Sequence, residues 1–273
     1  IDGTEDSFGG SKSANTGNAG NPLAQLYRGR RNFNKNLNIL GNIWAEADVI
    51  KDLTFKTQLN TDFNNANSRA FRFRTPENQE DQGAQNFNEN WSNGFTWTWT
   101  NTLGYKLALG EKHKISALAG YEAIKGDFRN INGSVNDYFS TDPNIWYLNP
   151  AFGNAGTRQV GSSGSENSLV STFGKLDYSF NDQLFLSGTI RRDGSSRFAP
   201  EFKYGVFPAF SAAYRLSSLP FLKDNALVSD LKVRASWGKT GNQSIGDYNY
   251  FDRYGGNIGS AFYAIDGSNS APA

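Results

Sequence analysis

Several stretches of the chain alternate apolar and polar residues with a period of two. In residues 53–63, Leu53, Phe55, Leu59 and Phe63 alternate with Thr, Lys, Gln, Asn and Asp side chains. Residues 91–109 continue such a pattern for nineteen positions, with Trp, Phe, Tyr and Leu on one parity and mostly Ser, Thr and Lys on the other. This period predicts β-strands with one apolar and one polar face.

The same reasoning predicts about eight strands. They cover residues 36–49, 53–63, 91–109, 115–123, 170–180, 184–190, 204–214 and 231–237. Residues 1–34 and 239–273 are rich in Gly and Asn and carry no sustained period, which predicts loops. A short helix or irregular turn is expected within 217–230.

The connections between these strands alternate in length. The short ones are 50–52, 110–112, 181–182 and, less tightly, 217–230, and the long ones are 64–90, 125–167 and 192–203. Tight periplasmic turns opposite long extracellular loops are typical of outer-membrane barrels. A soluble sandwich has no such sidedness, and its strands usually run ~5–6 residues. The pattern therefore predicts an all-β, antiparallel transmembrane barrel segment whose apolar face meets lipid.

Composition agrees with this prediction and excludes several other classes. No window approaches the ~18 consecutive apolar residues of a membrane helix, while 14% of the residues are aromatic, as in barrels with interfacial girdles. A net charge of +1 gives no support for a nucleic-acid surface. There is no Cys and no Met, and no signal peptide is recognisable. We therefore expect a processed product or a fragment.

Residues that could carry chemistry are few. His113 is the one histidine, stands beside a turn and is expected to be solvated, because zinc and Ser-His-Asp sites need more ligands or partners. The run 193–196 lacks the Walker pattern and a nearby base, so a turning loop is favoured over a nucleophile or phosphate cradle. Asp137, Asp142 and Glu166 do not have the spacing of a calcium loop. We expect no enzymatic activity, no metal and no cofactor.

Two groups of motifs resemble a known family. The first is Arg191-Arg192-Asp193-Gly194-Ser195-Ser196-Arg197-Phe198 followed by Tyr204-Gly205-Val206-Phe207-Pro208. The second comprises Phe221-Leu222-Lys223-Asp224, Ser229-Asp230-Leu231-Lys232, Arg234-Ala235-Ser236-Trp237-Gly238 and Thr240-Gly241-Asn242-Gln243. Together they resemble the barrel signature of SusC/RagA-like TonB-linked outer-membrane transporters. The likeness is close over 168–250 and only stylistic over the first 160 residues.

The resemblance implies a barrel of ~22 strands closed around a plug. Residues 1–273 would be an interior part of that single barrel domain, without the plug, the TonB-contacting segment and the remaining strands. It further implies TonB-energised uptake of glycans or oligopeptides across the outer membrane of a Gram-negative bacterium. The implied partners are a SusD-like surface lipoprotein, the TonB complex, and outer-membrane lipid and lipopolysaccharide.

Candidate site residues follow from strand parity and from the resemblance. Lys175, Arg191 and Arg234 are predicted to face the lumen, where they either contact the plug or substrate path or simply solvate a wet wall. Trp146 and Tyr147 in the long loop either stack on a ligand or pack the loop, and packing is favoured. Outward aromatic girdles are expected at two rims, at Tyr178, Phe180 and Tyr214 and at Trp91 and Phe95.

Two other functions remain open. A passive porin or an adhesin barrel would have the same strand pattern but no dependence on TonB. A soluble β-rich carbohydrate-binding protein would bury the apolar residues in a core and remain in the aqueous phase. The repeated one-sided apolar strands argue against the soluble alternative.

Overall fold

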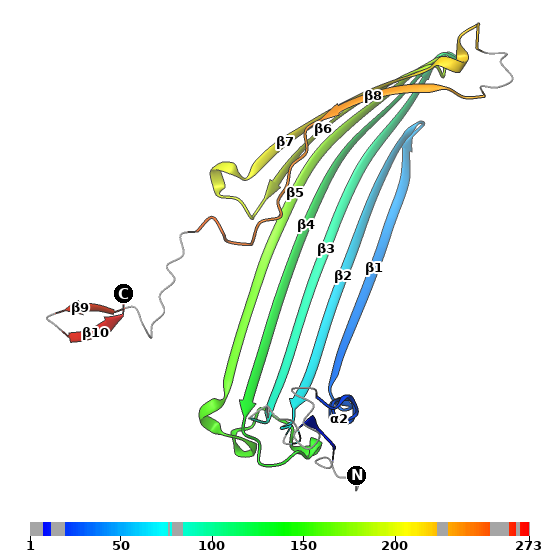
Figure 1. Ribbon diagram of the computed structural model, residues 1–273. Helices are drawn as coiled ribbons and strands as arrows, with labels where there is room; N and C mark the ends of the chain where they lie inside the picture. The colour runs from blue at the N-terminus through cyan, green and yellow to red at the C-terminus, as the bar shows by residue number, and fades with distance from the viewer. Residues whose placement is uncertain are drawn as a thin grey trace.

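The computed structural model describes residues 8–11, 20–75, 77, 84–222 and 229–251, together with the backbone of 262–265 and 268–272. Eight strands form one antiparallel sheet in which each strand pairs with the next along the chain (Figure 1). They are β1 (Phe33–Ile50), β2 (Leu53–Arg72), β3 (Asn86–Leu109), β4 (His113–Asn136), β5 (Gln159–Phe180), β6 (Leu184–Ser195), β7 (Tyr204–Arg215) and β8 (Lys232–Gly238). The predicted all-β, antiparallel barrel segment of about eight strands is confirmed, and the eight strands form an open sheet.

Tight turns join the strands at one end of the sheet, at the positions predicted for the shortest connections. Asp52 and Gly110 have φ angles of 64° and 63°, and Asn181 and Asp182 both have φ of 54°. Two consecutive residues with positive φ define a turn whose twist matches that of the flanking strands, and Asn and Asp tolerate this conformation best after Gly.

The ladders place matching side chains on the same face from β3 to β8. One row is apolar and comprises Leu107, Ile115, Tyr178, Leu186, Ala212 and Ala235. The neighbouring row, on the other face, is polar and comprises Lys106, Ser116, Asp177, Ser187, Ser211 and Ser236. We call the two surfaces the apolar face and the polar face, defined by these rows. The single register shift in these ladders, over the described residues, lies between Asp48 and Ile50.

Most strands are longer than predicted at the end away from the tight turns. The loops expected at 64–90, 125–167 and 192–203 shrink because β2 continues to Arg72, β3 begins at Asn86, β4 continues to Asn136, β5 begins at Gln159 and β6 continues to Ser195. These extensions are mostly polar and carry only scattered apolar residues, so they show no sustained period of two. Asparagine ladders hold them instead, such as Asn130 Nδ2 donating to Asn90 Oδ1 at 2.7 Å.

The strands also differ in height (Figure 1). β3 and β4 have 24 residues each, whereas β6 and β7 have 12. β3 therefore has more than twice the ~9–11 residues with which a strand crosses a bilayer. At about 3.4 Å per residue it is ~80 Å long. The pairing of β5 with β6 ends at Leu169 and Ser195, so residues 159–168 of β5 project beyond β6.

The expectation of loop over 1–34 and 239–273 is wrong in two places. Helix α2 (Pro22–Gly29) follows Asn21, whose Oδ1 accepts from the backbone N–H of Leu23 at 2.9 Å. A short helix in a Gly- and Asn-rich stretch is hard to predict because its capping residues are also common in loops. Near the other end, β9 (Phe262–Ile265) and β10 (Ser268–Pro272) pair in a separate two-stranded sheet.

A hydrophobic core lies at the tall end of the sheet, between the ends of β2, β3 and β4 and the loop 137–158. It consists of Phe71, Phe73, Phe87, Val135, Tyr138 and Trp146. The loop above it contains three short 3₁₀ helices, η1 (Pro143–Ile145), η2 (Pro150–Phe152) and η3 (Ala155–Thr157). We call this assembly the outer-loop core. Two further 3₁₀ turns, η4 (Pro200–Phe202) and η5 (Leu216–Ser218), lie in the β6–β7 and β7–β8 connections. The second begins the connection in which a short helix or irregular turn was expected.

Within the described residues, no helix is both long and apolar enough to cross a membrane.

Phe87→Ala is expected to loosen the outer-loop core. Phe87 is fully buried, and removing such a ring typically costs about 3–5 kcal/mol. Hydrogen exchange at the amides of Val135 and Tyr138 in the full-length protein would measure the change. Phe139→Ala is the matched control, because Phe139 is 70% exposed and exposed substitutions stay within about 0.5 kcal/mol. Equal exchange in the two variants would contradict this assignment of the core.

Candidate functional site: the polar face of the sheet

The structure places Lys175, Arg191 and Arg234 on the polar face, as strand parity predicts. Arg191 lies opposite Phe173 on β5 and Phe207 on β7. Lys175 lies two residues further along β5 than Phe173, and Arg234 lies opposite Ala213. The three cations therefore share one surface but occupy different levels of it.

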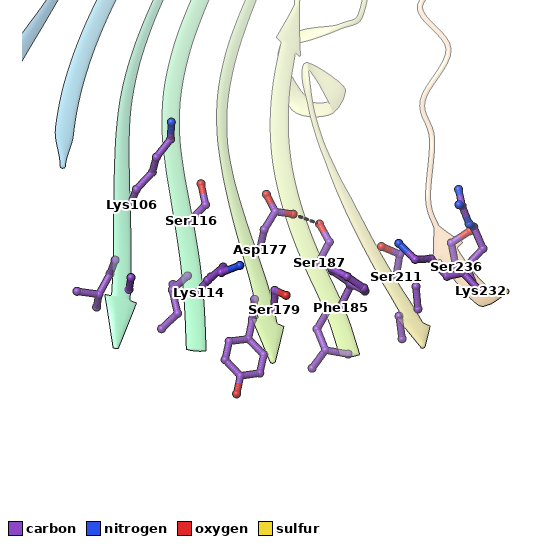
Figure 2. Close-up of a pocket in the computed structure, with 18 of the residues that line it drawn as sticks. Lys106, Lys114, Ser116, Asp177, Ser179, Phe185, Ser187, Ser211, Lys232 and Ser236 are labelled. Atoms are coloured by element: carbon purple, nitrogen blue, oxygen red, sulfur yellow. Dashed lines mark hydrogen bonds between the residues drawn. The ribbon is translucent and has the colours of Figure 1, made fainter. Parts of the chain in front are cut away.

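A hollow of about 1030 Å³ lies on this face near the tight turns. Figure 2 shows the polar row that lines it, with Lys106, Ser116, Asp177, Ser187, Ser211 and Ser236 on successive strands. Short hydroxyl side chains dominate the row, which leaves room above the backbone. The hollow can accept a polar or charged surface without steric conflict.

The charge in this hollow is mainly positive. Its lining includes Lys51, Lys106, Lys114, Lys232 and Arg234, against Asp52 and Asp177. Among the described residues, Lys114 pairs with Asp182, whereas no ion pair within 4 Å is formed by Lys51, Lys106, Lys232 or Arg234. A surface with unpaired cations is complementary to an anionic partner.

Two lysines of the hollow are already engaged. The Lys114 ammonium donates to both carboxylate oxygens of Asp182 at 2.8 Å, and this hydrogen bond lowers the pKa of the exposed Asp182 carboxyl. The Lys232 ammonium lies 4.1 Å from the centre of the Phe185 ring. Both contacts lie beside the tight turns, where they secure the ends of β4 and β8.

Arg191 is the centre of a network within the wall. Its Nε donates to Asp193 Oδ1 at 2.6 Å, and its Nη2 donates to Glu122 Oε1 at 2.9 Å and to the Ser171 hydroxyl at 2.7 Å. The other Glu122 oxygen accepts from the Thr100 hydroxyl at 3.1 Å. The network ties β3, β4, β5 and β6 together across the polar face, and Arg191 has two acidic partners of its own.

An aromatic ring supports this guanidinium. The centre of the Phe173 ring lies 5.4 Å from the Arg191 Cζ, within the range of a cation–π contact. The ring crosses over Gly120 on the neighbouring strand, where a Cβ would come within 2.1 Å of it. Glycine at position 120 is therefore what allows Phe173 to lie flat on the wall.

Lys175 makes a smaller contact. Its ammonium lies 2.9 Å from Asp177 Oδ2, and Asp177 also accepts from the Ser187 hydroxyl at 2.6 Å. The Lys175 and Asp177 side chains are 44% and 41% exposed, so water competes with this pair. Lys175 consequently remains accessible to a partner on the polar face.

The two aromatic candidates in the long loop have different surroundings. Trp146 is 3% exposed, and its ring stacks on Phe71 with 4.7 Å between the ring centroids. This side chain therefore packs the loop against β2. Tyr147 is 55% exposed and lies 5.7 Å from the Arg69 guanidinium. Burial, together with nearby Glu89, raises the pKa of the Tyr138 phenol beneath them.

Sequence reasoning did not identify the acidic half of the polar face. Glu122, Asp177 and Asp193 each bind a basic side chain, and Ser171 is fully buried against Arg191. Strand parity could have placed them on the same face as Arg191, but only the register shows that they meet.

His113 was expected to be solvated, yet its ring lies 4.9 Å from Phe180 and its Nδ1 is 2.8 Å from the Tyr178 hydroxyl. No group of His, Cys, Asp and Glu that could hold a metal ion occurs among the described residues.

Arg191→Met is expected to destabilise the full-length protein by about 1–2 kcal/mol, between the values for exposed and buried ion pairs, because Glu122 and Asp193 lose their common partner. Denaturant unfolding in detergent would measure the loss. Lys175→Met is the matched control and is expected to cost less than about 0.5 kcal/mol, since its pair is exposed. Adding Glu122→Gln to Arg191→Met is expected to recover part of the loss, and no recovery would argue against the network.

The chain matches the family model described as TonB dependent receptor-like, beta-barrel, over residues 2–271. The TonB-dependent receptor P39 of Formosa agariphila is 28% identical over 254 residues, which are 90% of this chain and 23% of that protein. The TonB-dependent receptor SusC of Bacteroides thetaiotaomicron is 42% identical over 90 residues, which are 33% of this chain and 9% of that protein. The chain thus spans about a quarter or less of the curated relatives it matches.

Solved structures share the fold. A structure of the RagAB peptide transporter superposes with a TM-score of 0.72 at 24% identity, over 87% of this chain and 26% of that one. The RagAB peptide importer in its closed-closed state gives a TM-score of 0.73 at 24% identity, over 90% of this chain and 27% of that one. With the family model matching almost every residue, this chain belongs to the β-barrel family of TonB-dependent receptors and is SusC/RagA-like.

Proposed function

We propose that this chain forms part of the wall of a TonB-energised nutrient importer in the outer membrane of a Gram-negative bacterium. The observation that carries the proposal is the two-faced sheet. Large side chains on the apolar face are uncovered, including Trp99 at 45%, Phe210 at 59% and Trp237 at 62% exposure. A contiguous apolar surface of this extent needs a partner, and in this family the partner is lipid.

The polar face is proposed to enclose the lumen. Residues 1–273 would then be one part of a single barrel domain, with the plug supplied by other parts of the protein. Lys175 and Arg234 are proposed to contact the plug or line the substrate path, because both remain accessible and the hollow around Arg234 is positive. Arg191 has its own acidic partners, so its proposed contribution is to fix the shape of the lumen wall.

The loops at the tall end are proposed to face the outside of the cell. There a SusD-like lipoprotein would deliver a glycan or an oligopeptide, and the TonB complex would act through the plug. Tyr147 is the proposed ligand contact, because it is exposed and rests on the rigid outer-loop core. Trp146 is proposed to support Tyr147 from below. We propose no catalytic step.

The face assignment predicts unequal penalties at two adjacent positions. Leu103→Arg is expected to destabilise the full-length protein by about 2–4 kcal/mol, because it places a charge in mid-bilayer lipid. Thr102→Arg points into the polar face and is expected to be much milder. Unfolding of the protein from lipid vesicles would compare them. Equal penalties, or the reverse order, would show that the faces are assigned wrongly.

Transport itself is tested in cells that express the full-length protein together with a SusD-like lipoprotein. Uptake of fluorescent oligopeptides and of fluorescent glycan oligomers is compared in strains with and without TonB. We expect uptake of one of the two probes to be lost without TonB. Uptake that continues without TonB would instead favour the alternative of a passive porin, and absence of uptake of both probes with surface binding retained would favour an adhesin.

A further inference from the structure

The segment that follows β8 leaves the sheet and returns across its polar face. Residues 239–251, which we call the strap, run from the end of β8 past β7 and β6 toward β5 (Figure 1). Arg197, in the β6–β7 connection, holds the strap at two points. Its Nε lies 2.8 Å from Asp247 Oδ1, and its Nη1 donates to the Gln243 carbonyl at 3.1 Å.

The strap is also attached to the projecting part of β5. Asn167 Nδ2 lies 3.4 Å from Asp247 Oδ2, and the backbone N–H of Glu166 donates to the Tyr248 hydroxyl at 3.3 Å. Tyr248 has a φ of 62°, a conformation that costs a non-glycine residue of order 1 kcal/mol and that persists only where contacts enforce it. Contacts from Arg197, Asn167 and Glu166 are therefore among those that hold the strap in place.

Close packing shows on which face the strap lies. Phe207 is opposite Arg191 on the polar face, and its ring fills the space beside Gly241 of the strap and Gly205 of β7. A Cβ at Gly241 would come within 2.3 Å of this ring, and one at Gly205 within 2.6 Å. The absence of side chains at both glycines lets the strap lie directly on the wall.

The strap reaches the level of the Arg191 network. A cavity of about 270 Å³ lies between strap and wall, and Asp193 and Phe207 of the wall line it with Asn242 and Gln243 of the strap. Hydrogen bonds of the β6–β7 connection fix the backbone around Arg197. Its backbone N–H donates to the hydroxyl of Ser195, which is 3% exposed, and the Ser196 hydroxyl accepts from the backbone N–H of Ser168 at 2.8 Å.

The ion pair between strap and connection is largely shielded from water. The Arg197 and Asp247 side chains are 27% and 13% exposed, less than those of Lys175 and Asp177. Removing the Asp247 carboxylate leaves the Arg197 guanidinium partly buried without the acidic partner it has here, which is unfavourable. The position of the strap on the wall thus depends on both side chains.

We propose that Arg197 is a positioning residue that holds residues 239–251 inside the barrel, where the strap narrows the passage beside the Arg191 network. The proposal rests on the proposed function for the identification of the polar face with the lumen. Losing the Arg197–Asp247 pair releases the strap from the wall and widens the passage, while the sheet remains intact.

The test uses the full-length protein in lipid nanodiscs, in a cysteine-free background, with spin labels at Ser244 of the strap and Leu176 on the apolar face. Electron–electron distance measurements are expected to give a single narrow distribution. Arg197→Ala and Asp247→Asn are each expected to replace it by a broad distribution at longer distances. The charge-swapped pair Arg197→Asp with Asp247→Arg is expected to restore the narrow distribution, which a general folding defect would not allow.

Arg158→Ala is the matched control, because Arg158 is an exposed arginine of the outer loop, and it is expected to leave the distribution unchanged. An unchanged distribution in both Arg197→Ala and Asp247→Asn would overturn the proposal. The label at Ser244 separates this outcome from failure of the proposed function. A water-soluble paramagnetic reagent reaches it if the polar face encloses the lumen, whereas dissolved oxygen reaches it preferentially if that face meets lipid.

Discussion

The antiparallel ladder of the eight-stranded sheet is the constraint on which the rest of this structure depends. Because successive side chains of a strand point to opposite faces, a register whose one shift lies at the end of β1 sorts the described residues of eight strands into two surfaces. A shift of one residue in any strand would carry its Leu and Trp side chains to the polar face. The rows that begin at Leu107 and at Lys106 show how completely this sorting is achieved.

The central parts of the strands could be predicted from the sequence because lipid-facing positions must be apolar. Where that requirement ends, the pattern ends too, and prediction fails at residues 64–72 and 125–136. The backbone there continues in strands because neighbouring strands still offer hydrogen-bond partners, and asparagine ladders suit water on both sides. Backbone pairing thus sets the length of the strands in this chain. The period of two in apolar residues depends instead on whether one face meets lipid or both faces meet water.

For the candidate site residues, the face of the sheet could be predicted from the sequence, but the partners could not. Parity places Lys175, Arg191 and Arg234 on one face without knowledge of the register. The partners of Arg191 could not be deduced, because Glu122 lies 69 positions away in the sequence and meets it only through the β4–β5–β6 pairing. Likewise Trp146 becomes a core residue only because the loop folds back on Phe71 of β2.

The unequal heights of β5 and β6 have a consequence for how large molecules approach. Ten residues of β5 rise past its neighbour, about 34 Å of extended chain, so the outer rim descends abruptly on the side of β6 to β8. If the sheet is part of a closed wall, as proposed, this descent makes one side of the mouth lower than the other. A bulky cargo would arrive obliquely over the low side, guided by the tall strands opposite.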